Sequence, residues 1–353
     1  MSKYLAEELQ KLAPYTPGEQ PKGGEYVKLN TNESPYFPSR YAVSRVTEKA
    51  LDELRLYSDP ESAALRDAIA KHYRLKRENV AVGNGSDELL AFAFRAFGQN
   101  GACFPDVTYG FYKVFAALTG TAAEEIPLKE DFTLNARDYF GKKKLVVFAN
   151  PNAQTGIFLP LADVERIVKN NADSVVLADE AYIDFGGESA ASLVGKYENL
   201  LVVQTFSKSR SLAGARVGFA LGNAALIGDL ERVKYSFNPY NVNRLSALLA
   251  TAAMEDTSYF SDCTEKIVKT RAFTAEELKR RSFTVLPSSA NFLLAKSAKT
   301  GGRELYEKLK ERGVLVRWFS DKRIADFVRI SIGTPENMRA LLAEIDWIEG
   351  GTK

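Results

Sequence analysis

A lysine, two hydroxyl side chains and an arginine follow one apolar run of the sequence. Thr205, Ser207 and Lys208 come directly after the run Leu200–Gln204. Arg216 stands eight residues after Lys208, in an apolar segment flanked by glycines. A lysine after a strand is usually a solvated side chain, but an arginine in such a segment needs an anion to satisfy its guanidinium group. The cluster therefore predicts a phosphate site with an amine within reach.

A carboxylate and a tyrosine follow a second apolar run. Asp179 comes directly after the run 175–178, and Tyr182 stands three residues later. A carboxylate at this position commonly caps the following turn, and Glu180 could do the same. If Asp179 is buried, it can instead hold the proton on a cationic ring nitrogen, which makes such a ring an electron sink. Tyr182 could then donate its hydroxyl to an oxygen of that ring.

Short apolar runs that alternate with helical patterns position these residues. The runs cover residues 80–83, 144–149, 174–178 and 200–204, and helices are expected over Ser86–Phe97, with Ser86 as N-cap, and Leu161–Asn170. Continuous β-branched runs separated by helices predict an α/β fold with a mostly parallel sheet covered on both faces. Ligands bind at the carboxyl ends of such strands. The residues after each run should therefore converge at one edge: Asn84–Ser86, Asn150–Asn152, Asp179–Tyr182 and Thr205–Lys208.

The pattern changes at both ends of the chain. Residues 1–36 are rich in proline and glycine and predict an extended arm. After one or two helices between Asn243 and Arg281, shorter strands and helices indicate a smaller α/β domain, which ends in a helix from Pro335. We therefore expect an arm over 1–36, a large domain over 37–243 and a small C-terminal domain over 244–353.

The composition excludes several classes of protein. The 47 basic and 45 acidic side chains nearly cancel, so neither nucleic acid nor a membrane surface is expected as a partner. No apolar stretch approaches the roughly 20 residues of a membrane span, and no signal peptide is evident, which favours the cytoplasm. Two isolated cysteines, Cys103 and Cys263, also fit a reducing compartment. His72 is the only histidine and is expected at the end of a helix, so no metal site is predicted.

The order of short motifs along the chain resembles that of the fold-type-I pyridoxal phosphate aminotransferases of class I and II, and within them the histidinol-phosphate aminotransferases. The resemblance implies a large domain with a mostly parallel, seven-stranded sheet, a smaller C-terminal α/β domain, and pyridoxal 5′-phosphate as cofactor. It also implies a homodimer. The motifs that carry it are Leu12–Tyr15, Leu29–Glu33, Gly83–Glu88, Pro105–Tyr112, Asn150–Gly156, Asp179–Tyr182, Ser207–Lys208 and Val328–Thr334.

The resemblance further implies a role for each matching residue. Lys208 would bind the cofactor covalently and later move the α-proton of the substrate. Asp179 would pair with the ring nitrogen, Tyr182 would bond the ring oxygen O3′, and Tyr109 would stack on the ring. The other cofactor contacts, most of them to the phosphate, would come from Gly85, Ser86, Asp87, Thr205, Ser207, Arg216 and, across the dimer, Tyr57 of the partner subunit.

One motif departs from the family pattern. The family often has two adjacent asparagines before Pro-Thr-Gly, and the second of them bonds O3′; here Ala153 occupies that position, in Asn150-Pro151-Asn152-Ala153-Gln154-Thr155-Gly156. Asn152 could substitute from one residue earlier, or Tyr182 could hold O3′ alone. Loss of one neutral hydrogen bond costs about 0.5–1.5 kcal/mol, so activity is still expected.

The resemblance implies amino transfer between histidinol phosphate and 2-oxoglutarate, with glutamate as donor, in histidine biosynthesis. Arg329 would bind the substrate α-carboxylate, and Arg317, with Tyr15, would bind the phosphate of histidinol phosphate; Asn30 belongs to the same pocket. Arg323 could take the role of Arg317. In that case Arg317 would be a solvated charge at the edge of a strand. Two other functions stay open: an aromatic amino acid aminotransferase, with Trp318 and Phe319 lining the pocket, and a decarboxylase of the threonine phosphate type.

Overall fold

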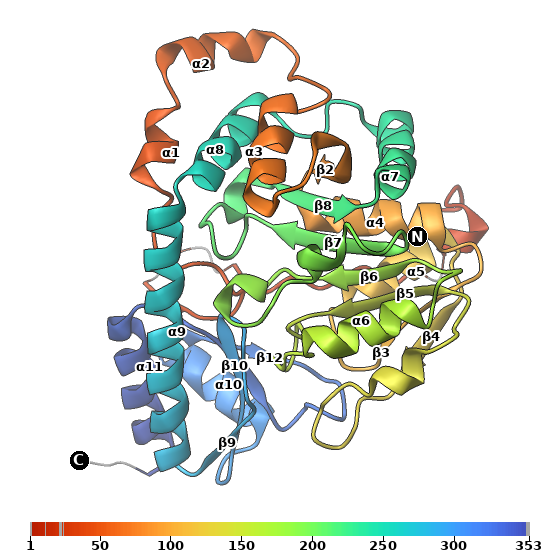
Figure 1. Ribbon diagram of the computed structural model, residues 1–353. Coiled ribbons are helices and arrows are strands. Elements are labelled where there is room, and N and C mark those ends of the chain that lie inside the picture. Colours follow the sequence, from red (N-terminus) through yellow and green to blue (C-terminus); the bar gives the residue numbers. More distant parts are fainter. Residues whose placement is uncertain (1, 11, 21–22, 24, 351–353) are drawn as a thin grey trace.

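Seven strands form the central sheet of the computed structural model, which describes residues 2–10, 12–20, 23 and 25–350 (Figure 1). The strand order is β2-β8-β7-β6-β5-β3-β4. β8 is antiparallel to both neighbours, and the pairs from β7 to β4 are parallel, which confirms the mostly parallel α/β sheet. The strands are β2 Val80–Gly83, β3 Ala102–Pro105, β4 Ala123–Ile126, β5 Leu145–Ala149, β6 Val176–Asp179, β7 Leu200–Thr205 and β8 Gly218–Gly222.

Helices cover both faces of this sheet. Alternate strand residues point to opposite faces, so in β5 Val147 packs with α4, α5 and α7, while Val146 packs with α3, α6 and α8. Because both faces are buried along β2, β5, β6 and β7, these strands read as apolar runs in the sequence, whereas the edge strand β4, with Glu124 and Glu125, does not. These helices are α3 Ala63–Tyr73, α4 Ser86–Phe97, α5 Phe111–Thr119, α6 Leu161–Lys169, α7 Ala224–Phe237 and α8 Arg244–Glu255.

A smaller antiparallel sheet, with the order β12-β13-β10-β9, contains the C-terminal strands. The arm contributes to this part of the molecule, since its strand β1 pairs in parallel with β11, Val27 opposite Val314. The elements of this part are β1 Val27–Lys28, α9 Thr257–Arg280, β9 Phe283–Val285, β10 Phe292–Ser297, α10 Gly302–Glu311, β11 Val314–Leu315, β12 Arg317–Trp318, β13 Val328–Ser331 and α11 Pro335–Ile348. The two short helices α1 Arg40–Ser44 and α2 Glu48–Asp52 lie apart from it, on the side of α8 (Figure 1).

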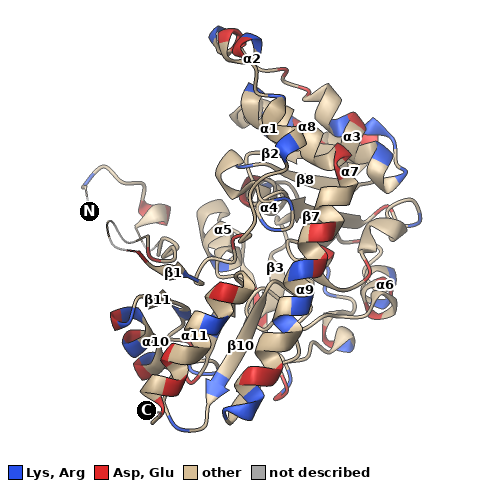
Figure 2. Cartoon of the chain, turned by 90° about the vertical axis from the view of Figure 1, so that its left-hand side faces the viewer, with Lys and Arg blue, Asp and Glu red and all other residues tan. Residues whose placement is uncertain are grey.

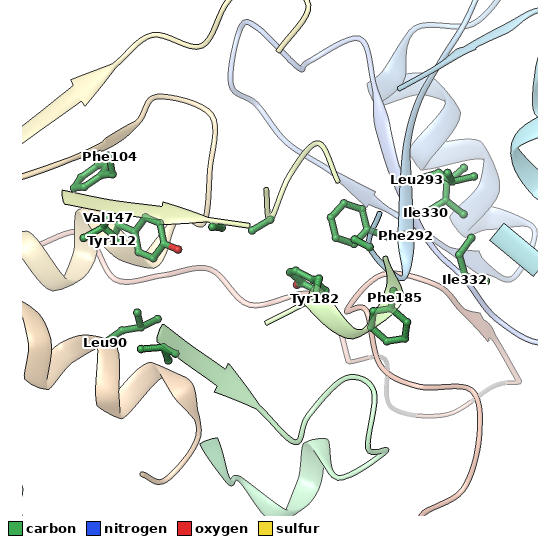
Figure 3. Packing of buried hydrophobic residues seen from close by; sticks show 14 of the residues in the cluster. Leu90, Phe104, Tyr112, Val147, Tyr182, Phe185, Phe292, Leu293, Ile330 and Ile332 are labelled. Carbon is green, nitrogen blue, oxygen red and sulfur yellow. The ribbon is translucent and has the colours of Figure 1, made fainter. Parts of the chain in front are cut away.

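Apolar packing joins the two sheets. Tyr182, just after β6, and Phe292, in β10, form an edge-to-face pair with ring centroids 5.1 Å apart. Figure 3 shows this pair between Tyr112 on the side of the large sheet and Ile330 on the side of the small sheet. The loop after β6 is therefore fixed against both sheets.

The surface carries charges of both signs. Along α9, Lys266 pairs with Asp262 and Lys269 with Glu265, one helical turn apart in each case, and Figure 2 shows the alternation along the helix. Across the described ranges, no helix combines the length and apolar character that a bilayer crossing requires. Within the same ranges, no group of three or more His, Cys, Asp or Glu side chains is arranged to bind a metal ion.

Two local predictions differ from the structure. Ser86 is the first residue of α4, and Gly85, with φ +81°, is the N-cap. The apolar segment Val314–Trp318, which the sequence pattern predicts as one strand, divides into β11 and β12, which pair with different strands. Of the one or two helices expected between Asn243 and Arg281, the structure has two, because Asp256 caps α9 by accepting a hydrogen bond from the backbone N–H of Tyr259.

Candidate active site

A cavity of about 230 Å³ lies where the carboxyl ends of the strands meet the arm and the small sheet. Its wall combines the end of β6, the loop after β7, the start of α4, residues of the arm, and side chains from β12 and β13. The structure therefore brings together most of the residues that the sequence singled out: Lys208, Asp179, Tyr182, Ser86, Asp87, Tyr109, Thr205, Ser207, Arg216, Arg329, Arg317, Tyr15 and Asn30.

One end of the cavity has the composition of an anion site. The N-terminus of the twelve-residue helix α4 opens there, and its unpaired N–H groups and dipole favour negative charge. Nη1 of Arg216 lies 3.5 Å from the Ser207 hydroxyl, and its Nη2 lies 3.1 Å from Asp87 Oδ2. The Thr205 hydroxyl lies 3.0 Å from that of Ser207.

Two glycines allow this close approach. A Cβ on Gly85 would lie 2.4 Å from Nη2 of Arg216, and a Cβ on Gly218 would lie 2.4 Å from the backbone nitrogen of Ser86. Gly85 also has φ +81°, a conformation that other residues rarely adopt. Gly85 does not itself line the cavity; its contribution is the backbone geometry that starts α4 beside Arg216.

The opposite side of the cavity holds a buried carboxylate. Asp179 is 4% exposed; its Oδ2 accepts a 2.6 Å hydrogen bond from the Tyr112 hydroxyl and its Oδ1 a longer one from the backbone of Ala181. Burial raises the pKa of Asp179 to about 6, although both hydrogen bonds act in the opposite direction. In the part of the chain that the structure describes, no lysine or arginine forms an ion pair with this carboxylate, so the wall offers a place for a cationic ligand group.

Lys208 lines the same cavity. Its Nζ donates to the backbone oxygen of Thr31 at 3.1 Å and lies 5.9 Å from the ring centroid of Tyr182. Burial, with a further contribution from the positive charge of Arg329, lowers the pKa of Lys208 to about 8. At pH 7 about a tenth of this amine is therefore neutral, and the neutral form can attack a carbonyl group.

Two arginines face the cavity without a carboxylate partner among the described residues. Arg329 donates to backbone oxygens of Ala153 and Asn30, at 3.1 and 3.4 Å, and its buried Nε has no hydrogen-bond acceptor. Arg317 donates to the backbone oxygens of Thr16 and Pro17, at 2.9 and 3.2 Å. Backbone oxygens do not neutralise a guanidinium group, so both side chains can bind a ligand anion.

Aromatic side chains and an amide complete the wall. The Tyr109 hydroxyl donates to Asp87 Oδ1 at 2.8 Å, which fixes the ring at the side of the cavity. The Tyr15 ring lies 6.2 Å from that of Tyr109 and is stacked on Phe111. Asn30 is 3% exposed and its Oδ1 has no hydrogen-bond donor among the described residues.

Besides Gly85, two predicted cofactor residues, Asn152 and Tyr57, lie outside the cavity wall. The Asn152 side chain turns away, because its Nδ2 donates to the Val107 oxygen at 3.0 Å and its Oδ1 accepts from the backbone of Gln154 and Thr155. It therefore serves the turn after β5 and does not take the place of an amide at position 153. Tyr57 is 79% exposed and stacks on Tyr240, with ring centroids 4.6 Å apart.

The alternatives considered for the phosphate-reading arginine and the aromatic pocket are also placed elsewhere. Arg323 pairs with Asp106 at 2.7 Å and donates to the Lys129 oxygen, so it is not available to the cavity. Trp318 and Phe319 line a neighbouring cavity on the far side of Arg317. His72 is exposed in the last turn of α3.

Sequence reasoning missed two residues of the site. Asn32 lines the cavity in a left-handed conformation, φ +56°, and its Nδ2 donates to the Tyr182 hydroxyl at 3.0 Å. Its neighbour in the same motif, Asn30, was selected instead, and only the tolerance of asparagine for positive φ could have indicated Asn32. Tyr112 was missed because a tyrosine in an apolar helix is expected in the core, where it indeed lies.

Comparison with known proteins agrees with this geometry. Residues 24–345 match the family model of aminotransferase class I and II. The chain is 50% identical over 348 residues to histidinol-phosphate aminotransferase 2 of Rhizobium meliloti, covering 98% of this chain and 99% of that one. It is 47% identical over 351 residues to the histidinol-phosphate aminotransferase of Brachyspira hyodysenteriae, covering 99% of each.

Solved structures show the same fold. The histidinol-phosphate aminotransferase of Sinorhizobium meliloti in complex with pyridoxal-5′-phosphate superposes with a TM-score of 0.88 at 24% identity, covering 97% of this chain and 96% of that one. A putative histidinol-phosphate aminotransferase from Erwinia carotovora atroseptica gives a TM-score of 0.84 at 22% identity, covering 92% and 96%. Because the family model matches residues 24–345, well over half of this chain, the chain belongs to the class I and II aminotransferases.

Proposed function

We propose that this protein is a pyridoxal phosphate-dependent aminotransferase that moves an amino group between histidinol phosphate and the 2-oxoglutarate/glutamate pair. Relatives that carry the name histidinol-phosphate aminotransferase and share about half of its residues support the reaction. The observation that carries the proposal is that Lys208, the Asp179 carboxylate and the Arg216 anion site line one cavity.

The described residues fit the proposed cofactor. When bound, pyridoxal phosphate supplies an aldehyde that reacts with amines and a protonated ring that withdraws an electron pair from the substrate. Asp179, without a cationic partner in the wall among the described residues, would hold the proton on the ring nitrogen. Lys208 would hold the cofactor through its aldehyde carbon and, once freed by the substrate amine, would carry the proton from the amine-bearing carbon of the substrate to that former aldehyde carbon.

Contacts at the other positions hold the cofactor in place. Tyr109 would stack on the ring, and Tyr182 would donate its hydroxyl to the ring oxygen, since both line the cavity. Backbone N–H groups at the start of α4 and the side chains of Ser86, Thr205, Ser207 and Arg216 would bind the phosphate, with Asp87 fixing Arg216.

The two arginines without a carboxylate partner among the described residues bind different anionic groups of the substrates. Arg329 binds the α-carboxylate of glutamate or 2-oxoglutarate, and Arg317, with Tyr15, binds the phosphate of histidinol phosphate. Asn30 lies between them, with an amide oxygen available as an acceptor. Both kinds of substrate thus meet a cation at the same end of the cavity, which allows one site to serve both half-reactions.

We further propose a cytoplasmic homodimer. Apolar side chains are exposed along α2 and the segment that follows it, among them Leu51, Leu54, Leu56 and Tyr57. Such a surface is expected to be buried in an assembly. Tyr57 would then reach the cofactor phosphate of the partner subunit, while the arm (1–36), large domain (37–243) and small domain (244–353) form each subunit.

A half-reaction tests the proposed function. Enzyme loaded with pyridoxal phosphate is mixed in turn with histidinol phosphate, phenylalanine, tyrosine and threonine phosphate, and the visible absorbance of the bound cofactor is followed. We expect the fastest change with histidinol phosphate, and no visible cofactor band in Lys208→Ala, whereas the exposed-lysine control Lys266→Ala keeps it. A preference for phenylalanine or tyrosine would indicate an aromatic aminotransferase, and carbon dioxide release from threonine phosphate a decarboxylase.

A further inference from the structure

Tyr182 is the only protein side chain that the proposed function places on the ring oxygen, so the direction of its hydroxyl proton matters. The Tyr182 oxygen accepts a hydrogen bond from Nδ2 of Asn32 at 3.0 Å. Among the described residues, the Tyr182 hydroxyl has no acceptor for its own hydrogen, and Tyr182 lines the cavity. The hydrogen is therefore free to point toward a ligand.

Asn32 is held in place by three hydrogen bonds from the small sheet. Its backbone N–H donates to the Ser331 hydroxyl oxygen, and the Ser331 hydroxyl in turn donates to Asn32 Oδ1, each at 2.8 Å. The backbone oxygen of Asn32 accepts from Nδ2 of Asn291 at 2.9 Å. Asn32 is 1% exposed, so these contacts fix both its left-handed backbone and its side chain.

The same contacts fix which end of the amide faces Tyr182. The Ser331 oxygen already accepts from the Asn32 backbone, and its hydrogen needs an acceptor in a buried site. Asn32 Oδ1 supplies that acceptor, which turns Nδ2 toward Tyr182. The reverse orientation would leave the Ser331 hydrogen unpaired among the described residues. It would also turn the Tyr182 hydrogen away from the cavity, toward the amide oxygen.

We propose that Asn32, held by Ser331, is a positioning residue that directs the Tyr182 hydroxyl to the ring oxygen of the cofactor, in a site where Ala153 offers no polar side chain. The inference rests on the proposed function. We call the contacts that lead from Ser331 through Asn32 to Tyr182 the relay. Ser331 lies in β13 and Tyr182 follows β6, so the relay also makes cofactor binding depend on how the small sheet and the arm pack against the large sheet (Figure 3).

A double-mutant cycle tests the relay. The ligand is 4′-deoxypyridoxine phosphate, which keeps the ring oxygen but cannot react with Lys208, and its dissociation constant is measured by fluorescence titration. We expect Tyr182→Phe and Asn32→Ala each to weaken binding by about 3- to 10-fold, the effect of one hydrogen bond. In the Tyr182→Phe background, Asn32→Ala should cause no further loss, because Asn32 acts through Tyr182.

A further pair of variants at Ser331 and a control at Asn171 separate positioning from folding. Ser331→Ala should weaken binding in the same direction, and Ser331→Thr, which keeps the hydroxyl, should restore it; these variants also serve if Asn32→Ala does not fold. Asn171→Ala removes a buried amide that bonds only to the backbone far from the cavity, so it should leave ligand affinity unchanged.

The outcomes distinguish this inference from the proposed function. If wild-type protein does not bind the ligand, the proposed cofactor is wrong. If the wild type binds and Tyr182→Phe weakens binding, but Asn32→Ala has no effect or adds its full effect in the double variant, only the relay is wrong.

Discussion

Removal of the Tyr112 hydroxyl should change the pH range in which the cofactor binds. Tyr112 donates to Asp179 Oδ2 at 2.6 Å, and both side chains are buried. A hydrogen bond to a charged group contributes about 1.5–3 kcal/mol. At about 1.36 kcal/mol per pKa unit, Tyr112→Phe should raise the pKa of Asp179, about 6 in the wild type, by roughly one to two further units.

The sign of the effect follows from the state that binds. The ring nitrogen needs the ionised carboxylate, so affinity is full above the pKa of Asp179 and falls as the pH drops below it. At pH 6 the wild-type carboxylate is about half ionised, whereas in Tyr112→Phe only about 1–10% is, which predicts an affinity lower by roughly 5- to 50-fold. At pH 8.5 both carboxylates are largely ionised, and the two proteins should bind almost equally.

The assay is the fluorescence titration with 4′-deoxypyridoxine phosphate at pH 6 and pH 8.5. Because the ligand is the same, its own titration cancels in the ratio of variant to wild type. Tyr139→Phe is the matched control, since Tyr139 is also buried and its hydroxyl has no hydrogen-bond partner among the described residues. A Tyr112→Phe defect of equal size at both pH values would refute the argument that Tyr112 acts on the ionisation of Asp179.

Three further predictions concern the charged groups of the site. In cofactor-free protein, acetylation of Lys208 should level off above about pH 8, its lowered pKa, while exposed Lys266 continues to gain reactivity; peptide mass spectrometry measures both, and parallel curves would contradict the lowered pKa. Gly85→Ala should weaken pyridoxal phosphate binding about tenfold or more by displacing Arg216, whereas Gly120→Ala, which has positive φ but open space, should only lower the free energy of unfolding by about 1 kcal/mol. Arg317→Ala should weaken the binding of histidinol phosphate by roughly 10- to 100-fold and that of phenylalanine little, as measured by their dissociation constants. Equal losses of affinity for the two ligands would show that Arg317 does not bind the phosphate.

The sequence predicted the central sheet and the position of the site because both depend on strong local signals. β6 and β7 are covered on both faces and therefore read as apolar runs, and the polar residues that follow them, Asp179 and Lys208, reach the same cavity. The predicted N-cap of α4, Ser86, was one residue too late. The N-cap is Gly85, whose lack of a side chain leaves room for Arg216, more than a hundred positions away.

What the sequence did not predict depends on contacts between distant segments. The orientation of Asn152 is decided by the hydrogen bonds of its own turn and the Val107 oxygen, and a residue type alone does not indicate them. The difference between Arg317 and Arg323 in the structure comes from Asp106, which forms an ion pair with Arg323. Asn32 acquires its place through Ser331, Asn291 and Tyr182, each of which is more than a hundred positions away in the sequence.

The pairing of β1 with β11 sets an order in which the molecule can be completed during synthesis. The strands of the large sheet emerge from the ribosome before Val314 and Ser331 have been synthesised. Until then the arm residues Val27 and Asn32 have no partners to pair with in the small domain. Pairing between segments so far apart is slow, since the intervening chain must be ordered first. The large sheet can therefore form around an open edge, and the wall that carries Asn30, Asn32, Arg317 and Arg329 closes last. A nascent chain would hold the core of an aminotransferase well before it holds a place for a substrate.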